Sequence, residues 1–270
     1  MTKKINELFF LRPWAVKEDI LQIMTEIVQR HLRGEKLTAE DIEAVTKQSN
    51  KKDDVNYEVI DGVAHIPIYG IISKRMSLVR SISQPAGTSI QEITKNLKAA
   101  LDDKEAKTIL LDIDSPGGSV DGVDELSDYI YQARGQKPII AYANGMMASA
   151  AYYIGSAANE VYASKSSEVG SIGVFAVLRD FSVMEHNEGI KTQIIKAGKY
   201  KAAGHSSMPL AEDAKQVIQE EVDYYYELFV EAVGRNRGIT SEEALTLADG
   251  KVYIGKKAVQ VGLVDGLRSF

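Results

Sequence analysis

Two short segments of the chain carry residue types that together could break a peptide bond. In Asp114-Ser115-Pro116-Gly117-Gly118, the adjacent glycines permit positive φ angles, so that consecutive backbone N–H groups can point at one anion. Ser149 precedes the small residues Ala150 and Ala151, where we expect a helix to begin. There the Ser149 hydroxyl could attack a carbonyl while the Ala150 N–H stabilises the oxyanion. A simple turn and a serine N-cap are the structural alternatives.

A third segment, residues 196–204, could supply the base. It contains Lys196, Lys199 and Lys201. A lysine can take the proton of a serine if burial makes it neutral near pH 7, because desolvation disfavours the ammonium ion and lowers its pKa. A solvated basic loop is the alternative for this segment. A lysine base would suit a chain with few histidines, and we expect the nearby His205 to be dispensable.

Composition excludes several other chemistries. The chain has no cysteine and four histidines, which removes thiol nucleophiles and cysteine-based zinc sites. No two histidines have the spacing of metal ligands, so neither a metal nor another cofactor is expected. The net charge of −6 argues against a nucleic-acid partner. With 44% hydrophobic and 26% charged residues, the 270-residue chain can form a packed core.

The elements that must position these segments alternate between strands and helices. Strands are expected at Tyr57–Ile60, Val63–Ile68, Thr108–Ile113, Pro138–Tyr142, near Val161, near Ile172 and at Thr192–Lys196. Helices are expected after Gly87-Thr88-Ser89, at about Val120–Arg134, from about Ser149, near Val177–Asn187, at Ala211 to about Asn236 and at Ser241–Ala248. This order predicts a mostly parallel sheet with the candidate residues at the ends of strands.

The first part of the chain differs from the rest. Apolar residues form a helical stripe along Lys17–Leu32, a shorter helix can begin at Thr38, and the polar run Gln48–Asp54 is typical of a linker. We therefore expect residues 1–56 to be a helical appendage with its linker, and residues 57–270 to be the catalytic domain.

The uncharged stretch at 138–159 has the length of a membrane span. Pro138 and the turn-like Asn144-Gly145 favour a buried strand, a loop and a buried helix instead. The apolar patch Leu8–Leu11 is too short for a secretory signal. We expect a cytoplasmic protein without a membrane anchor.

Four motifs in this order resemble the signal peptide peptidase A family of serine peptidases. They are Asp-Ser-Pro-Gly-Gly (114–118), Met-Ala-Ser-Ala-Ala-Tyr-Tyr (147–153), Glu-Val-Gly-Ser-Ile-Gly-Val (168–174) and Gly-Lys-Tyr-Lys (198–201). The likeness runs from about Val59 to the end of the chain. It implies the α/β fold that the Clp protease proteolytic subunit shares with the crotonases, built of stacked ββα units and assembled as a homo-oligomer.

The resemblance also implies roles for particular residues. Ser149 matches the nucleophile, Lys201 the general base, and Gly118 with Gly117 the oxyanion loop. Lys199 is the rival base, but the family places the base at the second lysine of Gly-Lys-Tyr-Lys. Ser149 and Lys201 are further expected to meet near or across a protomer interface.

The start of the chain resembles one branch of this family. Where membrane-attached relatives carry an anchor, this chain has Phe10-Leu11-Arg12-Pro13-Trp14-Ala15 followed by a helix, which looks like the head-maturation proteases of tailed bacteriophages. The expected function is therefore a Ser-Lys endopeptidase that cleaves scaffold or head proteins through an acyl-enzyme. A cytosolic enzyme that degrades peptides and a non-proteolytic assembly protein on the same fold are the alternatives.

Overall fold

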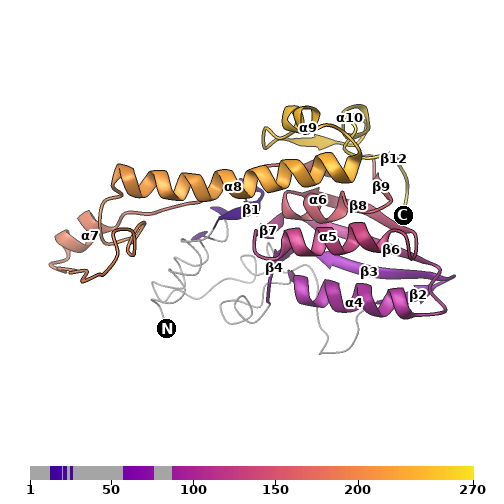
Figure 1. Cartoon of the computed structure of the whole chain (residues 1–270), viewed down its shortest axis with the longest axis horizontal. Coiled ribbons are helices and arrows are strands. Elements are labelled where there is room, and N and C mark those ends of the chain that lie inside the picture. Colours follow the sequence, from indigo (N-terminus) through magenta and orange to yellow (C-terminus); the bar gives the residue numbers. More distant parts are fainter. Residues whose placement is uncertain (1–12, 20, 23–24, 27–56, 76–86) are drawn as a thin grey trace.

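The computed structural model describes residues 13–19, 21–22, 25–26, 57–75 and 87–270 as two sheets with covering helices (Figure 1). The larger, eight-stranded sheet has the order β11-β10-β8-β6-β3-β2, with β9 beside β8 and β12 beside β9. Its strands are β2 (Glu58–Ile60), β3 (Val63–Tyr69), β6 (Thr108–Ser115), β8 (Ile139–Ala148), β9 (Glu160–Ala163), β10 (Glu168–Gly170), β11 (Val252–Ile254) and β12 (Gly266–Leu267). The pairs of β6 with β3 and of β8 with β6, β9 and β10 are parallel, which confirms the predicted sheet.

The smaller sheet has four strands in the order β1-β7-β4-β5. They are β1 (Trp14–Val16), β4 (Ile71–Ser73), β5 (Gly87–Ser89) and β7 (Gly117–Ser119). Strand β7 follows directly after β6, so the chain passes from the larger sheet into the smaller one through Pro116.

Helices α4 (Ile90–Asp102), α5 (Val123–Ala133) and α6 (Ala150–Gly155) lie side by side over one face of the larger sheet (Figure 1). The core between them is formed by apolar side chains that alternate along the strands and recur along the helices, including Ile66, Ile68, Ile93, Leu97, Ile109, Leu111, Ile113, Leu126 and Ile130. The Ser89 hydroxyl accepts the Glu92 N–H at 3.1 Å and begins α4, so the helix predicted after Gly87 is confirmed.

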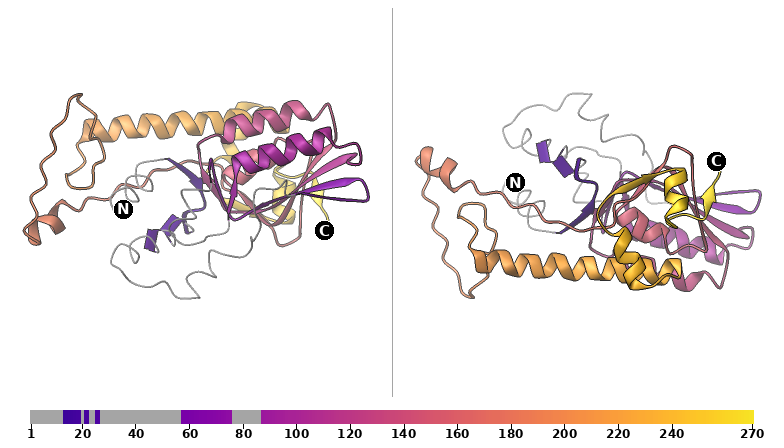
Figure 2. Two further views of the ribbon diagram at one scale, coloured as in Figure 1. Left: turned by 90° about the horizontal axis from the view of Figure 1, so that it is seen from below. Right: turned by 90° about the horizontal axis from the view of Figure 1, so that it is seen from above.

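The remaining helices lie toward the C-terminus. They are α7 (Ser182–Asn187), α8 (Glu212–Arg237), α9 (Ser241–Leu247) and α10 (Lys256–Gln260). Helix α8 packs on the core at its C-terminal end and extends well beyond it (Figure 1). Residues 178–211, which contain α7 and which we call the arm, lie at the far end of α8 in both views of Figure 2.

The predicted hairpin is confirmed. Strands β2 and β3 pair antiparallel, with Ile60 opposite Val63, and Asp61-Gly62 forms the turn between them. Both turn residues have positive φ angles, 49° and 80°, as a two-residue hairpin turn requires.

Two other predictions were wrong. No loop interrupts 138–148, because β8 continues through Asn144-Gly145 to Ala148, pairing with β6 on one side and β10 on the other. No strand forms at Thr192–Lys196 either, although these residues are described. Ile195 is 99% exposed there, so a segment with apolar, β-branched side chains has found no sheet to join within the described chain.

Most of the predicted appendage falls outside the described residues, including the helix at Thr38, the linker Gln48–Asp54 and the boundary at 56/57. Residues 18–19, 21–22 and 25–26 are helical, in agreement with the stripe along Lys17–Leu32. Strand β1, from the same part of the chain, pairs with β7 of the smaller sheet. In the described part of the chain we find no helix whose length and apolar character would let it cross a bilayer.

Candidate active site

Ser149 lies at the junction of β8 and α6, with 1% of its surface exposed. Its φ of 55° and ψ of −121° fall in a region that residues with a side chain rarely adopt. The Ser149 N–H donates to the Gly170 carbonyl at 2.7 Å, and the Ser149 carbonyl accepts the Tyr153 N–H at 2.9 Å. Within the described chain the hydroxyl makes no capping hydrogen bond to α6. The alternative of a serine N-cap is therefore wrong, and the hydroxyl stays available for chemistry.

Gly117 lies against Ser149, and both Gly117 and Gly118 lie against neighbouring strands. A Cβ atom built on Gly117, whose φ is 100°, would lie 2.9 Å from the Ser149 Cβ and 2.3 Å from the Ala15 carbonyl oxygen. One built on Gly118 would lie 1.7 Å from the Ile72 carbonyl oxygen. Both positions therefore require glycine. The predicted loop is here the strand β7, whose backbone passes beside the serine.

Ser115 fixes the bend that brings Gly117 to this place. Its fully buried hydroxyl donates to the Gly70 carbonyl at 2.6 Å and accepts the Gly117 N–H at 3.1 Å. The sequence-based reasoning did not assign a role to Ser115. A serine two residues before a glycine is typical of such local side chain–backbone bonds, and this signal could have identified it. The Gly117 N–H is thus bonded to Ser115, and the roles of Gly117 and Gly118 as oxyanion donors stay predictions.

A small, mostly apolar cavity lined in part by Tyr153 of α6 was also missed. Its lining residues are Ala15, Val120, Val123, Asp124, Tyr153, Val174, Tyr225, Leu228 and Phe229. Tyr153 follows Ser149 by one helical turn, and its ring stacks on Phe229 of α8 with the ring centroids 4.6 Å apart. An aromatic residue four positions after the candidate nucleophile was the available signal.

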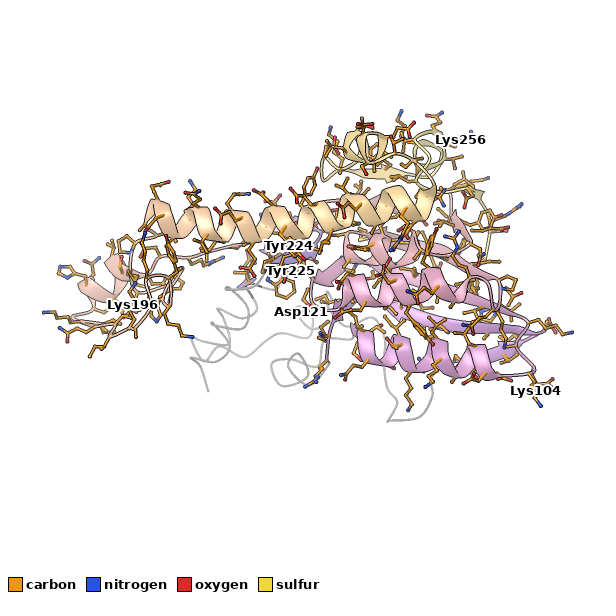
Figure 3. All side chains as sticks on the ribbon, viewed as in Figure 1. Lys104, Asp121, Lys196, Tyr224, Tyr225 and Lys256 are labelled. Atoms are coloured by element: carbon orange, nitrogen blue, oxygen red, sulfur yellow. The ribbon has the colours of Figure 1, made fainter. Side chains whose placement is uncertain are left out.

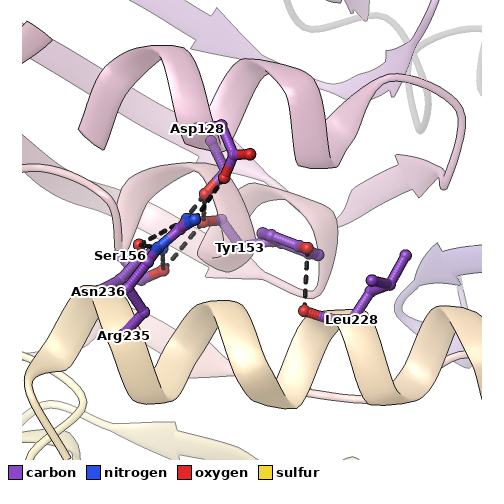
Figure 4. A network of polar contacts seen from close by, with 7 residues as sticks. Asp128, Tyr153, Ser156, Leu228, Arg235 and Asn236 are labelled. Carbon is purple, nitrogen blue, oxygen red and sulfur yellow. Dashed lines mark hydrogen bonds and ion pairs between the residues drawn. The ribbon is translucent and has the colours of Figure 1, made fainter. Parts of the chain in front are cut away.

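Polar contacts hold α6 against α8, as Figure 4 shows. The Tyr153 hydroxyl donates to the Leu228 carbonyl at 3.0 Å. The buried Asn236 amide donates to the Ser156 hydroxyl at 3.0 Å and to the Ser127 hydroxyl of α5 at 3.2 Å. The end of α8 is therefore fixed to the helix that begins at Ser149.

Lys201 lies on the arm, away from Ser149. Its side chain is exposed, as are those of Lys196 and Lys199. Figure 3 places Lys196 at the far end of the molecule from the α5–α6 region, with Tyr224 and Tyr225 between them on α8. One protomer thus brings together Ser149, Ala150, Gly117 and Gly118 and leaves Lys201 apart. His205 is also on the arm, where its Nδ1 accepts the Ser207 N–H at 3.2 Å.

Two other lysines can be compared with Lys201 as bases. Lys199 forms an ion pair with Asp213 at 2.8 Å, and this hydrogen bond raises the pKa of the Lys199 ammonium. Lys17, whose N–H donates to the Pro116 carbonyl beside Gly117, pairs with Glu168 at 2.7 Å. The hydrogen bond to Glu168 likewise raises the pKa of Lys17. Both are held as cations, which is the wrong form for a general base.

Comparison with known families agrees with this geometry. The Clp protease family matches residues 61–169, and peptidase family S49 matches residues 132–270, a little over half of the chain. The chain belongs to peptidase family S49. This confirms the resemblance to the signal peptide peptidase A family and the α/β fold of the Clp protease type.

Individual relatives include phage proteins and bacterial proteases. The chain is 31% identical to the head-tail preconnector protein GP5 of Enterobacteria phage P21, over 78% of this chain and 42% of that protein. It is 29% identical to the capsid assembly protease C of Escherichia phage lambda, over 87% and 54%. It is 27% identical to protease 4 of Haemophilus influenzae, over 92% and 41%. The chain thus spans about half the length of these curated relatives.

Proposed function

We propose that this protein is a serine endopeptidase with Ser149 as nucleophile and Lys201 as general base. The observation that carries the proposal is the state of Ser149. It is buried, its backbone is strained, its hydroxyl does not cap α6, and it lies against Gly117, a position that only glycine can occupy. Backbone strain of this kind at a side-chain-bearing residue is typical of active sites.

In the proposed reaction, neutral Lys201 accepts the proton of the Ser149 hydroxyl as its oxygen attacks a peptide carbonyl. The N–H groups of Gly118 and Ala150 stabilise the tetrahedral oxyanion. The amine leaves with the proton from Lys201, and an ester remains on Ser149. Water then attacks this ester, giving its proton to Lys201, and the acid product leaves as the serine hydroxyl is restored.

The position of Lys201 supports a dyad formed between two copies of the chain. Ser149 is buried in the core, and Lys201 is exposed on the arm. The arm also exposes several large apolar side chains, namely Val183, Met184, Ile190, Ile195, Tyr200 and Met208. Apolar surface gathered on one projecting segment is typical of a protein interface. Packing against a neighbouring protomer would bury Lys201 and lower its pKa, as a general base requires.

The substrate class follows from the relatives. One is described as a capsid assembly protease and another as a head-tail preconnector protein. We propose that this chain cleaves scaffold or head proteins during phage capsid maturation. The small side chains of Ala148 and Ala150 on either side of Ser149 favour a small or apolar substrate residue near the cleaved bond.

The test combines labelling of the nucleophile with complementation. A fluorophosphonate should label wild-type protein at Ser149, and Ser149→Ala should lose both the label and peptide hydrolysis, by a factor on the order of 10⁴ or more. If the dyad forms between protomers, mixing inactive Ser149→Ala with inactive Lys201→Ala should restore part of the activity. A Ser149→Ala variant with full activity would refute the proposed nucleophile.

The substrate is tested by co-expression. Mass spectrometry of a neighbouring head or scaffold protein, co-expressed with wild type or with Ser149→Ala, should detect new termini in the wild-type sample alone. Binding of that protein with identical termini in both samples would instead support a non-proteolytic assembly role.

A further inference from the structure

Strand β1 lies between two backbone segments of the catalytic domain. On one side it pairs antiparallel with β7, with Trp14 opposite Ser119, Ala15 opposite Gly118 and Val16 opposite Gly117. On the other side the Trp14 N–H donates to the Phe175 carbonyl at 2.8 Å, and the Phe175 N–H donates back at 3.1 Å. This is how an extended peptide is bound when it adds a strand to the edge of a sheet.

The centre of this strand is at the candidate nucleophile. The Ala15 carbonyl oxygen and the Ser149 Cβ both lie within 3 Å of the point where a Cβ of Gly117 would be, so they are close neighbours across that glycine. The Ala15 residue is 3% exposed and contributes to the lining of the apolar cavity with Tyr153 and Phe229.

From these contacts we infer that residues 14–17 occupy the binding position of an extended peptide substrate and thereby inhibit the enzyme. The inference rests on the proposed function, because it takes Ser149 as the nucleophile. Gly117 and Gly118 are both paired with β1, so the backbone that would bind a substrate is already engaged. A substrate can enter only after β1 leaves.

Contacts on both sides of β1 hold it in place. The Lys17 ammonium binds the Glu168 carboxylate at 2.7 Å, and the Lys17 N–H donates to the Pro116 carbonyl at 3.0 Å. Trp14 and Val16 pack in a small apolar cluster with Leu21 and Ile71. Because β1 belongs to the same chain, it competes with a substrate at a high effective concentration.

A permanent structural role for β1 is the competing explanation, and the two differ in what a bound peptide does. Hydrogen exchange of wild-type protein should be measured with Ser149 blocked by a peptidyl fluorophosphonate and, as the control, by a small alkyl fluorophosphonate. If β1 occupies the substrate position, the peptidyl inhibitor speeds exchange at residues 14–17 and the small inhibitor does not. Slow exchange at 14–17 with both inhibitors would overturn the inference.

A charge-reversal series tests the inhibition by β1 through the rate at which Ser149 is labelled. Lys17→Glu places two carboxylates together at Glu168, so β1 should leave more often and Ser149 should react about tenfold faster with a peptidyl fluorophosphonate. The double variant Lys17→Glu with Glu168→Lys restores the opposite charges and should return to the wild-type rate. Equal rates in all three proteins would overturn the inhibition and leave the nucleophile intact.

A peptide added in trans tests the placement of Ala15. A synthetic peptide of residues 13–19 should inhibit Lys17→Glu competitively, and the same peptide with Ala15→Asp should not, because the cavity that Ala15 helps to line is mostly apolar. Equal inhibition by both peptides would contradict the placement of Ala15. Absence of any Ser149 label, in every protein, would refute the proposed nucleophile and the inhibition with it.

Discussion

The two ends of α8 have opposite environments. Near its C-terminus the helix is packed into the protein, with Phe229, Val230, Ala232, Val233, Gly234 and Asn236 buried. In its first half Ala214 is the one buried residue among those described, and an exposed Lys199–Asp213 pair joins the helix to the arm. The same helix therefore holds the Ser149 region at one end and the segment with Lys201 at the other.

The two proposed catalytic residues, Ser149 and Lys201, therefore differ in what holds them in place. The proposed nucleophile and the nearby Gly117 are fixed by packing within one protomer, where a methyl group added to Gly117 would collide with backbone. The proposed base is instead carried on surface that has few contacts of its own, so its environment depends on what the arm binds.

We expect Lys201 of the arm to contribute to catalysis and Lys199 not to. Lys201→Ala should lower kcat by about 10²- to 10⁴-fold, the usual contribution of a general base. Lys199→Ala is the matched control, because Lys199 is two residues away and is held as a cation by Asp213. Peptide hydrolysis at saturating substrate measures both variants. A dead Lys199→Ala beside an active Lys201→Ala would reverse the assignment.

The core should not tolerate a methyl group at Gly117. Gly117→Ala should lower kcat by about a hundredfold, because the new Cβ would lie 2.9 Å from the Ser149 Cβ and must displace the serine from the proposed oxyanion site. Gly135→Ala is the control, since a Cβ there meets no atom within 4 Å. Activity of Gly117→Ala equal to that of the control would show that the serine is less tightly fixed than its contacts indicate.

The packed end of α8 should contribute more stability than the exposed end. Asn236→Ala removes two buried hydrogen bonds to serine hydroxyls and should lower the free energy of unfolding by about 1–3 kcal/mol. Gln216→Ala, on the exposed half of the same helix, should change it by less than about 0.5 kcal/mol. Urea denaturation compares the two, and equal losses would contradict the contrast.

The smallest effect concerns pH. Burial alone would raise the pKa of Asp265, but hydrogen bonds from Arg237 and from the Val161 N–H outweigh it and hold the pKa below its ordinary value of 3.8. A lowered pKa stabilises the fold above 3.8, and this contribution disappears as the pH falls through the folded-state pKa.

Asp265→Asn should therefore lower Tm at pH 7 and have progressively less effect below about pH 4. Asp213→Asn, which breaks the exposed pair at the other end of α8, should change Tm little at any pH. A constant Tm difference for Asp265→Asn down to pH 2 would show that the carboxylate charge is not responsible.

Local signals in the sequence predicted much of this fold. The hairpin at Asp61-Gly62, the cap at Ser89 and the long helix after Ala211 each depend on neighbouring residues, and each was found. The course of β8 through Asn144-Gly145 was missed because pairing with β6 and β10 outweighs a local turn signal. The strand predicted at Thr192–Lys196 does not form, for the opposite reason: these residues have strand propensity but no partner strand to pair with.

In the candidate site, too, local motifs predicted some features, while features that depend on long-range contacts were missed. Motifs indicated Ser149 and the two glycines, and the close approach of Gly117 to Ser149 supports that choice. The sequence could not predict the strained φ of Ser149, because this angle results from contacts with Gly170 and α6. The pairing of Trp14–Val16 with β7 joins segments about a hundred residues apart and has no local signal. The meeting of Lys201 with Ser149 near or across a protomer interface stays a prediction.

The continuity of α8 has a geometric consequence for the arm. A helix of 26 residues turns about 100° per residue and rises 1.5 Å per residue, so it spans about 39 Å. Each residue inserted into its exposed half would swing the arm around the helix axis by that angle. Seven inserted residues would bring it almost back into phase while moving it about 10 Å outward. Helix length thus sets both the reach and the direction in which Lys201 is presented.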